Sequence, residues 1–454
     1  MSDKRDLAVL AEYLAEIDAS RLPATVMSSA KACLLYGLAV GIATRPARLA
    51  QLALCAAQRH NESGSSTRLI DGALTSHGSA VFANAVLLSG RVQGDSHPCG
   101  HIGGVVIPAA LAAAESMQTS GVGLLTALVS GYEAALRIGR DHAADLSTRG
   151  FRTTPCYGVF GSAAATGRLR NFDAHEMQSA LAVAANFAGG LREYVDAGTE
   201  ESPFHAGFAG RNGVYAADLV SCGLIGADSA LHGKAGFYAA FGLPGVDYGK
   251  RVVSGFGTDF EFTSVTYKQY PACQFLRGMI KGLTELRERA PGVPPASIVV
   301  RMHPYEADFI GVRFKGPFTS STQTVMSAPF CAALAWVGGD VSFDGLRRFG
   351  DEGVNGVVAK VEIVTDPERK RYEPHITVTL QSGERLVWAG EAGDSAYRIH
   401  WKAAVDMAKQ LGREVRVPDL IVEQLIARVA GIEHEASVQP LIEAVCAATA
   451  VQPQ

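Results

Sequence analysis

Helical periodicity runs from Asp6 to about Phe241 and limits the possible folds more than any other feature of this sequence. Apolar side chains recur every three or four residues in Ala-, Leu- and Gly-rich segments, each bounded by Gly, Pro, Ser or Asp. No strand-like alternation competes with them. Small residues on the faces to be buried predict close helix packing and an apolar surplus that continues into a subunit interface. The predicted helices cover 6–18, 24–43, 46–59, 74–89, 105–117, 121–146, 157–169, 173–187, 206–223 and 234–241.

The pattern changes after about Ser264, where β-branched runs read as strands and Gln381-Ser382-Gly383 reads as a hairpin turn. Helical periodicity returns after Tyr397. We therefore expect a mainly α protein with one large all-helical domain, formed by both ends of the chain (1–265 and 398–454), and an inserted α+β domain (266–397). The predicted strands cover 296–303, the end of 356–365, 375–379 and 386–389, and the later helices cover 272–289, 320–337, 401–411, 419–430 and 438–448.

A glycine-rich loop between two predicted helices has the highest density of reactive side chains. Residues 90–107 read GRVQGDSHPCGHIGGVVI and contain Arg91, Asp95, His97, Cys99 and His101. Gly and Pro interrupt the helical pattern here, so these side chains should lie on an irregular connection at the mouth of a helix, where functional sites are common. The plainer alternative is a solvated loop in which His101 only caps the next helix.

Further loops at helix ends add cationic and hydroxyl groups. Arg152 and Tyr157 precede or open an Ala-rich helix whose first N–H groups could receive an anion. Arg192 lies in a second loop, and Lys268 and Cys273 lie in a third. Together these loops resemble an anion pocket in which arginines bind a carboxylate and His, Tyr or Lys moves a proton. We expect Asp95, His101, Arg152 and Lys268 to converge on one cleft between the two predicted domains.

Composition and motifs argue against several other functions. A formal net charge of -4 gives no reason to expect a nucleic-acid partner. The first residues do not form a signal-peptide pattern, and the apolar runs are too short or too charged to span a bilayer. The 8 scattered cysteines are typical of free thiols in a reducing compartment. We therefore expect a cytoplasmic protein with no membrane partner.

Cofactor and metal motifs are missing from the sequence too. It has no P-loop, no GxGxxG after a strand, no HExxH and no GxSxG elbow. His97 and His101 have the spacing of two ligands on one helical face, but Pro98 lies between them and disfavours a helix. The sequence therefore predicts neither a cofactor nor a metal ion.

Six segments resemble the MmgE/PrpD family, which includes 2-methylcitrate dehydratase, cis-aconitate decarboxylase and iminodisuccinate epimerase. They run through most of the chain. They are HGSAVFANAVLLSG at 77–90, HPCGHIGG at 97–104, RGFRTTPCYGVFGSAAAT at 149–166, FHAGFAGRNGVYAADLVSCGLIG at 204–226, YKQYPAC at 267–273 and SAPFCAALAWVGGDVS at 327–342. The resemblance implies a helical domain with an α+β lid, a homodimer, and metal-free chemistry on small polycarboxylates by proton removal beside a carboxylate.

The resemblance also shows where this chain differs from the family. His97 and His101 match the two loop histidines, whereas Arg91 replaces an aspartate and Asp95 a threonine. Arg152 stands where the family has the histidine of its GFHPT motif. Three further positions differ: Ser202 replaces a lysine, Phe330 replaces a tyrosine, and Cys273 stands where some decarboxylases have a histidine.

We therefore predict a cofactor-independent lyase or isomerase with an altered active site. His101, oriented by Asp95 or His97, would take a proton from a carbon beside a carboxylate, with Tyr157 as the acid on the opposite wall. The substrate anion would be held by Arg91, Arg152, Arg192, Lys268 and Cys273.

Two alternatives remain open. One is a non-catalytic descendant of the fold that serves as a scaffold or binds a metabolite. The other uses Cys99, Cys156 or Cys273 as a nucleophile.

Overall fold

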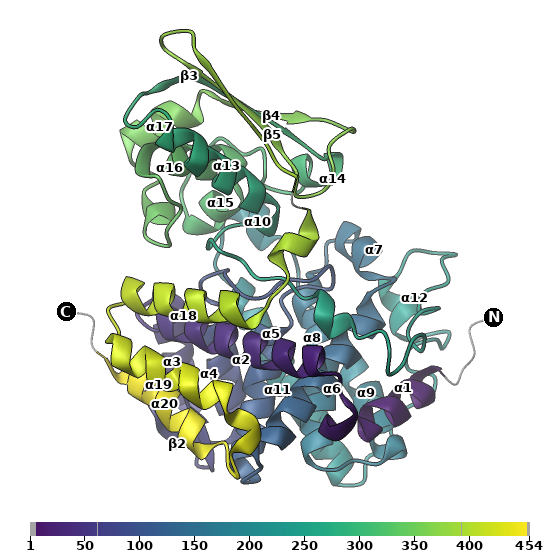
Figure 1. The fold of residues 1–454 in the computed structure, drawn as a ribbon. Coiled ribbons are helices and arrows are strands. Elements are labelled where there is room, and N and C mark those ends of the chain that lie inside the picture. Colours follow the sequence, from purple (N-terminus) through teal and green to yellow (C-terminus); the bar gives the residue numbers. More distant parts are fainter. Residues whose placement is uncertain (1–5, 61, 392, 452–454) are drawn as a thin grey trace. The chain divides into compact units, whose positions relative to one another are not determined.

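Helices build nearly all of the larger of two units into which the chain divides (Figure 1). The computed structural model describes residues 6–60, 62–391 and 393–451. The larger unit comprises residues 1–191, 202–265 and 399–454, and the smaller unit comprises 192–201 and 266–398. The prediction of a mainly α protein with a small α+β portion is confirmed.

The larger unit contains helices from both ends of the chain and one two-stranded sheet. Its helices are α1 (Asp6–Glu16), α2 (Ala24–Thr44), α3 (Arg48–His60), α4 (His77–Ser89), α5 (Gly103–Ser116), α6 (Gly121–Gly139), α7 (Ala143–Thr148), α8 (Thr153–Leu169), α9 (Ala174–Ala185), α11 (Ser202–Ser221), α12 (Phe237–Phe241), α18 (Trp401–Glu414), α19 (Asp419–Ala430) and α20 (Gln439–Ala450). Short 3-10 turns cover Ala19–Arg21, Glu261–Ser264 and Ile432–His434.

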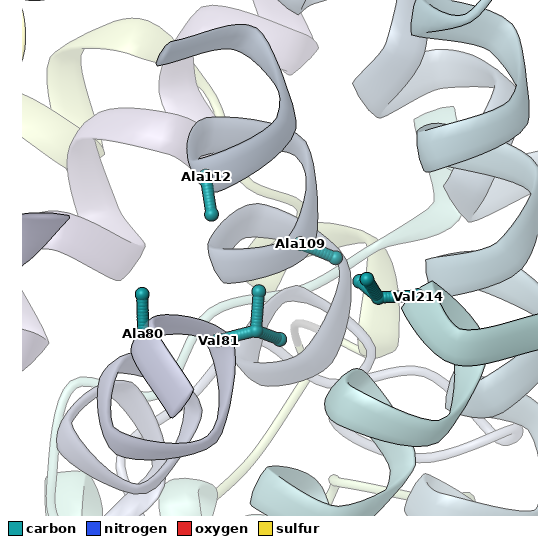
Figure 2. Close-up of a cluster of buried hydrophobic side chains, with 5 residues drawn as sticks. All are labelled: Ala80, Val81, Ala109, Ala112 and Val214. Carbon is teal, nitrogen blue, oxygen red and sulfur yellow. The ribbon is translucent and has the colours of Figure 1, made fainter. Parts of the chain in front are cut away.

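Small side chains allow the central helices of this unit to pack closely. At the crossing of α6 and α8, a Cβ atom added to Gly131 would lie 2.7 Å from the carbonyl oxygen of Gly161, and the reverse distance is the same. Only glycine fits such a backbone contact. Figure 2 shows the neighbouring cluster, in which side chains of α4 and α5 meet Val214 of α11. The predicted Ala/Gly-mediated packing is therefore present in the core.

Several helix boundaries differ from those predicted. A two-stranded sheet, β1 (Ser66–Arg68) with β2 (Ala73–Thr75), lies in the region predicted to lack strands. The next helix begins at 77 because the Ser76 hydroxyl accepts the Ser79 N–H and caps it. The helix predicted over 121–146 ends at Gly139. Beyond Gly139, Arg140 donates to Glu261 at 2.8 Å, and Asp141 accepts the N–H of Arg251. Residues 140–141 therefore bind the segment 251–261 and do not continue the helix.

The smaller unit is built on a four-stranded sheet in the order β4-β3-β5-β6. The β3–β4 pair is parallel, and the other two pairs are antiparallel. Gly383, with φ of 88°, allows the turn of the predicted hairpin between β5 and β6. Its strands are β3 (Pro295–Met302), β4 (Val361–Thr365), β5 (His375–Leu380) and β6 (Arg385–Ala389), and its helices are α10 (Tyr194–Ala197), α13 (Arg277–Glu288), α14 (Pro304–Ala307), α15 (Ser321–Met326), α16 (Ala328–Gly338) and α17 (Glu352–Val358).

Residues 192–201 belong to the smaller unit, although the sequence placed them in the helical domain. The reason is local packing: α10 contacts α15, and the Thr322 hydroxyl donates to the Thr199 carbonyl at 2.9 Å. Arg192 is therefore part of the smaller unit as well.

Helix α2 is long and apolar enough to cross a membrane by length and composition alone. However, 72% of its most apolar window is buried inside the structure, where it packs against α18 and α4. A buried core helix can be as long and as apolar as a membrane-spanning helix, and burial of this kind is typical of such a core helix.

Candidate active site

Asp95 uses its carboxylate to hold the beginning of α5. Both carboxylate oxygens lie 3.0 Å from the N–H of Gly103, and the Tyr132 hydroxyl donates to Oδ2 at 2.7 Å. An acidic group at a helix N-terminus satisfies a free N–H and interacts favourably with the helix dipole. The site can form only because residue 103 is glycine: a Cβ atom there would collide with the Tyr132 oxygen and lie 2.9 Å from Asp95 Oδ2.

His101 is oriented by the main chain of Asp95. The Nδ1 atom lies 2.6 Å from the Asp95 carbonyl oxygen. Because a carbonyl can only accept, Nδ1 must carry a proton, and the lone pair of the neutral ring is then on Nε2. The His101 N–H also donates to the Thr154 hydroxyl at 3.0 Å, which joins the loop to α8. The half-buried ring is therefore held in the tautomer whose Nε2 can accept a proton.

Both ring nitrogens of His97 have partners. Its Nδ1 accepts the N–H of Cys99 at 3.1 Å, and its Nε2 lies 3.3 Å from a carboxylate oxygen of Glu261. Burial would raise the pKa of Glu261, but hydrogen bonds from His97 and Arg140 outweigh it and lower that pKa to about 2. His97 thus ties the loop to an ionised carboxylate.

Arg152 lies where α8 and α11 begin. Its N–H donates to the Gly190 carbonyl at 2.9 Å, and its guanidinium donates to the carbonyl of Ser202, the first residue of α11. The main-chain N–H of His101 contacts Thr154 in the first turn of α8, and Arg152 directly precedes that helix. His101 and Arg152 therefore both lie at the beginning of α8. The first N–H groups of helices attract anions, so this arrangement suits a carboxylate.

Tyr157 and Arg91 occupy buried positions with their own partners. The Tyr157 hydroxyl lies 2.9 Å from Nδ1 of His142, in a cluster of aromatic rings, and burial raises its pKa well above the usual value. Arg91 forms an ion pair of 2.6 Å with Glu414 and is 2% exposed. Both contacts are suited to supporting the fold around the loop.

Three predicted site residues belong to the smaller unit. Lys268 is buried there, and the N–H of Cys273 donates to the Val325 carbonyl at 3.0 Å. The guanidinium of Arg192 lies over the ring of Phe309, 4.6 Å from its centroid.

The cysteines named as possible nucleophiles are all buried. Burial raises the pKa of Cys99, Cys156 and Cys273, that of Cys156 to about 12. A thiol in this state is a poor nucleophile, because the thiolate is the reactive form. In the described ranges, no group of three or more His, Cys, Asp and Glu side chains is arranged to hold a metal ion.

Several supporting residues were not predicted from the sequence. Tyr132 and Glu261 lie far along the chain from the loop that they stabilise, and each looks like an ordinary helix or loop residue in the sequence. Thr154 stood in a segment that we had singled out, but its contact with His101 was not predicted. These partners could not be predicted from a local motif, because only the tertiary fold brings them to the loop.

Comparison with known proteins identifies relatives of this chain. The MmgE/PrpD N-terminal domain matches residues 8–246. The cis-aconitate decarboxylase-like protein OryM of Aspergillus oryzae is 27% identical over 299 residues, which cover 63% of this chain and 62% of OryM. The cis-aconitate decarboxylase of Homo sapiens is 30% identical over 203 residues, 42% of this chain and 41% of the human protein. The enzyme of the same name from Aspergillus terreus is 28% identical over 225 residues, 47% of this chain and 46% of its own. The matches thus span less than two thirds of each relative.

Proposed function

The chain belongs to the MmgE/PrpD family, and on that premise we propose that it is a lyase that removes a proton beside a carboxylate of a small polycarboxylic acid. The observation that carries this proposal is the 2.6 Å contact between His101 Nδ1 and the Asp95 carbonyl. It leaves Nε2 as the basic nitrogen of the ring. When Nε2 takes the proton, the same carbonyl stabilises the imidazolium through Nδ1–H.

The position of Arg152 supports a carboxylate substrate. The family resemblance places a histidine at 152 and a lysine at 202, and this chain has arginine and serine there. The Arg152 guanidinium donates to the Ser202 carbonyl, so a positive charge lies at the start of α11 although residue 202 is neutral. Arginine stays protonated and cannot relay a proton, but it binds carboxylates well. We propose that Arg152 replaces the missing lysine as an anion holder and leaves proton transfer to His101.

The relatives point to the reaction class. Those compared above are named as cis-aconitate decarboxylases or as similar to them, which supports a lyase and gives no support to the isomerase alternative. We therefore propose a di- or tricarboxylate substrate and a reaction without a cofactor. Either the electron pair of the broken C–H bond forms a C=C bond and a neighbouring hydroxyl group leaves as water, or the protonated His101 returns its proton to the carbon that receives the electron pair when CO2 leaves. Lys268, Arg192 and Cys273 are retained as proposed substrate contacts on the evidence of sequence alone, as are the homodimer and the cytoplasmic location.

Proton NMR of the purified chain with a panel of small di- and tricarboxylates tests this function. We expect one member to lose a signal beside a carboxylate and to give a new olefinic or methylene signal. A protein that is folded, as judged by circular dichroism, and that leaves every member of the panel unchanged would contradict the lyase and favour the non-catalytic alternative.

A further inference from the structure

Four aromatic side chains of the smaller unit form a connected cluster beside α14, which is labelled in Figure 1. The ring centroid of Phe275 lies 5.6 Å from that of Tyr305 and 4.8 Å from that of Phe309. Tyr372 extends the cluster, with its ring centroid 6.1 Å from that of Phe275. Tyr305 lies on α14 itself and is 44% exposed, so the cluster reaches the surface. We call these four side chains the α14 cluster.

Two arginines lie on the rings of the α14 cluster. The Arg371 guanidinium is 4.7 Å from the ring centroid of Tyr305 and 5.3 Å from that of Tyr372. The Arg192 guanidinium lies over Phe309. A guanidinium that is stacked on a ring stays charged and keeps its N–H edge for hydrogen bonds. The cluster therefore carries two positive charges.

Arg371 differs from a buried arginine that contacts the same cluster. Arg277 also lies over the ring of Tyr372, but it donates to two main-chain carbonyls and to Asp394. Arg371 is exposed, and it donates to the Tyr372 hydroxyl at 3.2 Å. Among the residues that the structure describes, no carboxylate forms an ion pair with it. Arg277 thus supports the fold, whereas most N–H donors of Arg371 are available to a ligand.

The residue after Arg371 has an unusual main-chain conformation. Tyr372 has a φ of 64°, in the left-handed region that few residues other than glycine adopt. Its N–H donates to the carboxylate of the buried Glu306 at 2.9 Å, which holds this conformation. Such residues are common at ligand clamps and switch regions. Arg371 is therefore positioned in advance and should lose little freedom when it binds a ligand.

We propose that Arg371, beside the exposed ring of Tyr305, is a binding site for the phosphate or carboxylate group of a small organic anion. The planar guanidinium matches two oxygens of either group. Arg192 adds a second positive charge to the cluster, so a ligand with several negative groups should bind best. The proposal concerns the smaller unit alone and does not depend on the reaction assigned to His101.

The buried Glu306 gives this site a second measurable property. Burial raises its pKa to about 7, and the nearby Asp394 raises it further. The N–H of Tyr372 and the charges of Arg371 and Arg277 act in the opposite direction. An anion on Arg371 offsets part of that positive charge, so the carboxylate becomes easier to protonate. Binding near pH 7 should therefore take up protons and become tighter as pH falls.

Calorimetric titration of the full chain with pyrophosphate and, separately, with propane-1,2,3-tricarboxylate tests the site. The wild type should bind at least one probe, and Arg371→Gln should weaken that binding by about tenfold or more. Arg347→Gln is the matched control, because Arg347 also lies over a ring, that of Phe343, but pairs with Asp344. It should leave both affinities unchanged. Arg192 is kept, since it is already a proposed substrate contact.

The two probes distinguish the kinds of ligand. A loss with pyrophosphate alone identifies a phosphate site, a loss with the tricarboxylate alone identifies a carboxylate site, and a loss with both identifies a site for either group. Neither probe requires turnover. A wild type that binds neither probe at millimolar concentration, or a folded Arg371→Gln protein that binds both as tightly as the control, would overturn the proposal.

Titration in two buffers that differ in their enthalpy of ionisation measures the proton uptake. Glu306→Gln keeps an oxygen for the Tyr372 N–H but cannot take up a proton near pH 7. This variant should bind the probe without proton uptake. Uptake that persists in Glu306→Gln would overturn the coupling between the site and Glu306.

Discussion

His101 Nδ1 lies 2.6 Å from the main-chain oxygen of Asp95, while the carboxylate of the same aspartate holds the N–H of Gly103. One residue thus fixes the ring of the proposed base and the beginning of the next helix. The Tyr132 hydroxyl completes the arrangement from α6. Asp95 is therefore a positioning residue, because it acts on the proposed chemistry through His101.

Replacing His97 should affect stability more than catalysis. His97→Ala removes the acceptor for the Cys99 N–H and the partner of Glu261, so we expect the free energy of unfolding to fall by about 1–3 kcal/mol. The remaining folded protein should retain most of its kcat. Urea unfolding followed by circular dichroism, together with steady-state kinetics, checks both values. A stable variant without turnover would show that His97 takes part in the reaction.

Adding one methyl group at residue 103 should disturb the loop. Gly103→Ala places a Cβ atom against the Tyr132 oxygen and Asp95 Oδ2, and overpacking of this kind costs about 1–3 kcal/mol. Tyr132→Phe removes the colliding oxygen, so the double variant should be less destabilised than the sum of the single variants. Thermal unfolding of the four proteins measures this coupling. Strict additivity would contradict the observed contact.

His142 should make folding less favourable as the solution becomes acidic. Burial lowers its pKa from 6.5 to about 4. Between these values the unfolded chain takes up a proton that the folded chain does not, so the stability contributed by the neutral ring is complete above pH 6.5 and is lost as pH falls toward 4. His142→Gln should flatten the dependence of unfolding free energy on pH in this window. Replacing the exposed His175 in the same way should leave the dependence unchanged, and equal slopes for all three proteins would argue against the assignment.

Arg152 should govern substrate binding. Arg152→Gln removes the positive charge at the start of α11, and we expect KM to rise by about tenfold or more with a smaller change in kcat. Adding Ser202→Lys to this variant returns a cation to the same helix end and should recover part of the lost affinity, whereas Ser202→Gln should not. A loss confined to kcat would contradict the anion-holding role.

The fold was largely predictable because helical periodicity is a local property of the sequence. Apolar periodicity predicted the central helices, small residues on their buried faces predicted close packing, and the turn residues around Gly383 predicted the hairpin. The boundaries near Ser76 and Arg140 were missed because a cap or a distant carboxylate decides them. Residues 192–201 join the smaller unit through contacts with α15, which no local pattern shows.

The glycine-rich loop stood out in the sequence, but the contacts that its side chains make were not predictable. Asp95 was expected to orient His101, and its main-chain carbonyl contacts the ring of His101. His97 and His101 look equivalent in the sequence. In the structure, the two ring nitrogens of His97 contact the N–H of Cys99 and the carboxylate of Glu261. Arg91 is predicted to bind the substrate anion, and its ion pair with Glu414, 323 residues further along the chain, was not predictable. These roles depend on partners that only the folded structure brings together.

The most direct test of the account compares wild type with His101→Gln in D2O, using the carboxylate that the wild type converts. Proton NMR follows both product formation and exchange of the proton beside the carboxylate. We expect the variant to fold and to bind the substrate, while exchange and turnover both fall by at least about a hundredfold, the usual contribution of a general base. Exchange and turnover at the wild-type rate would contradict the assignment of His101 as the base.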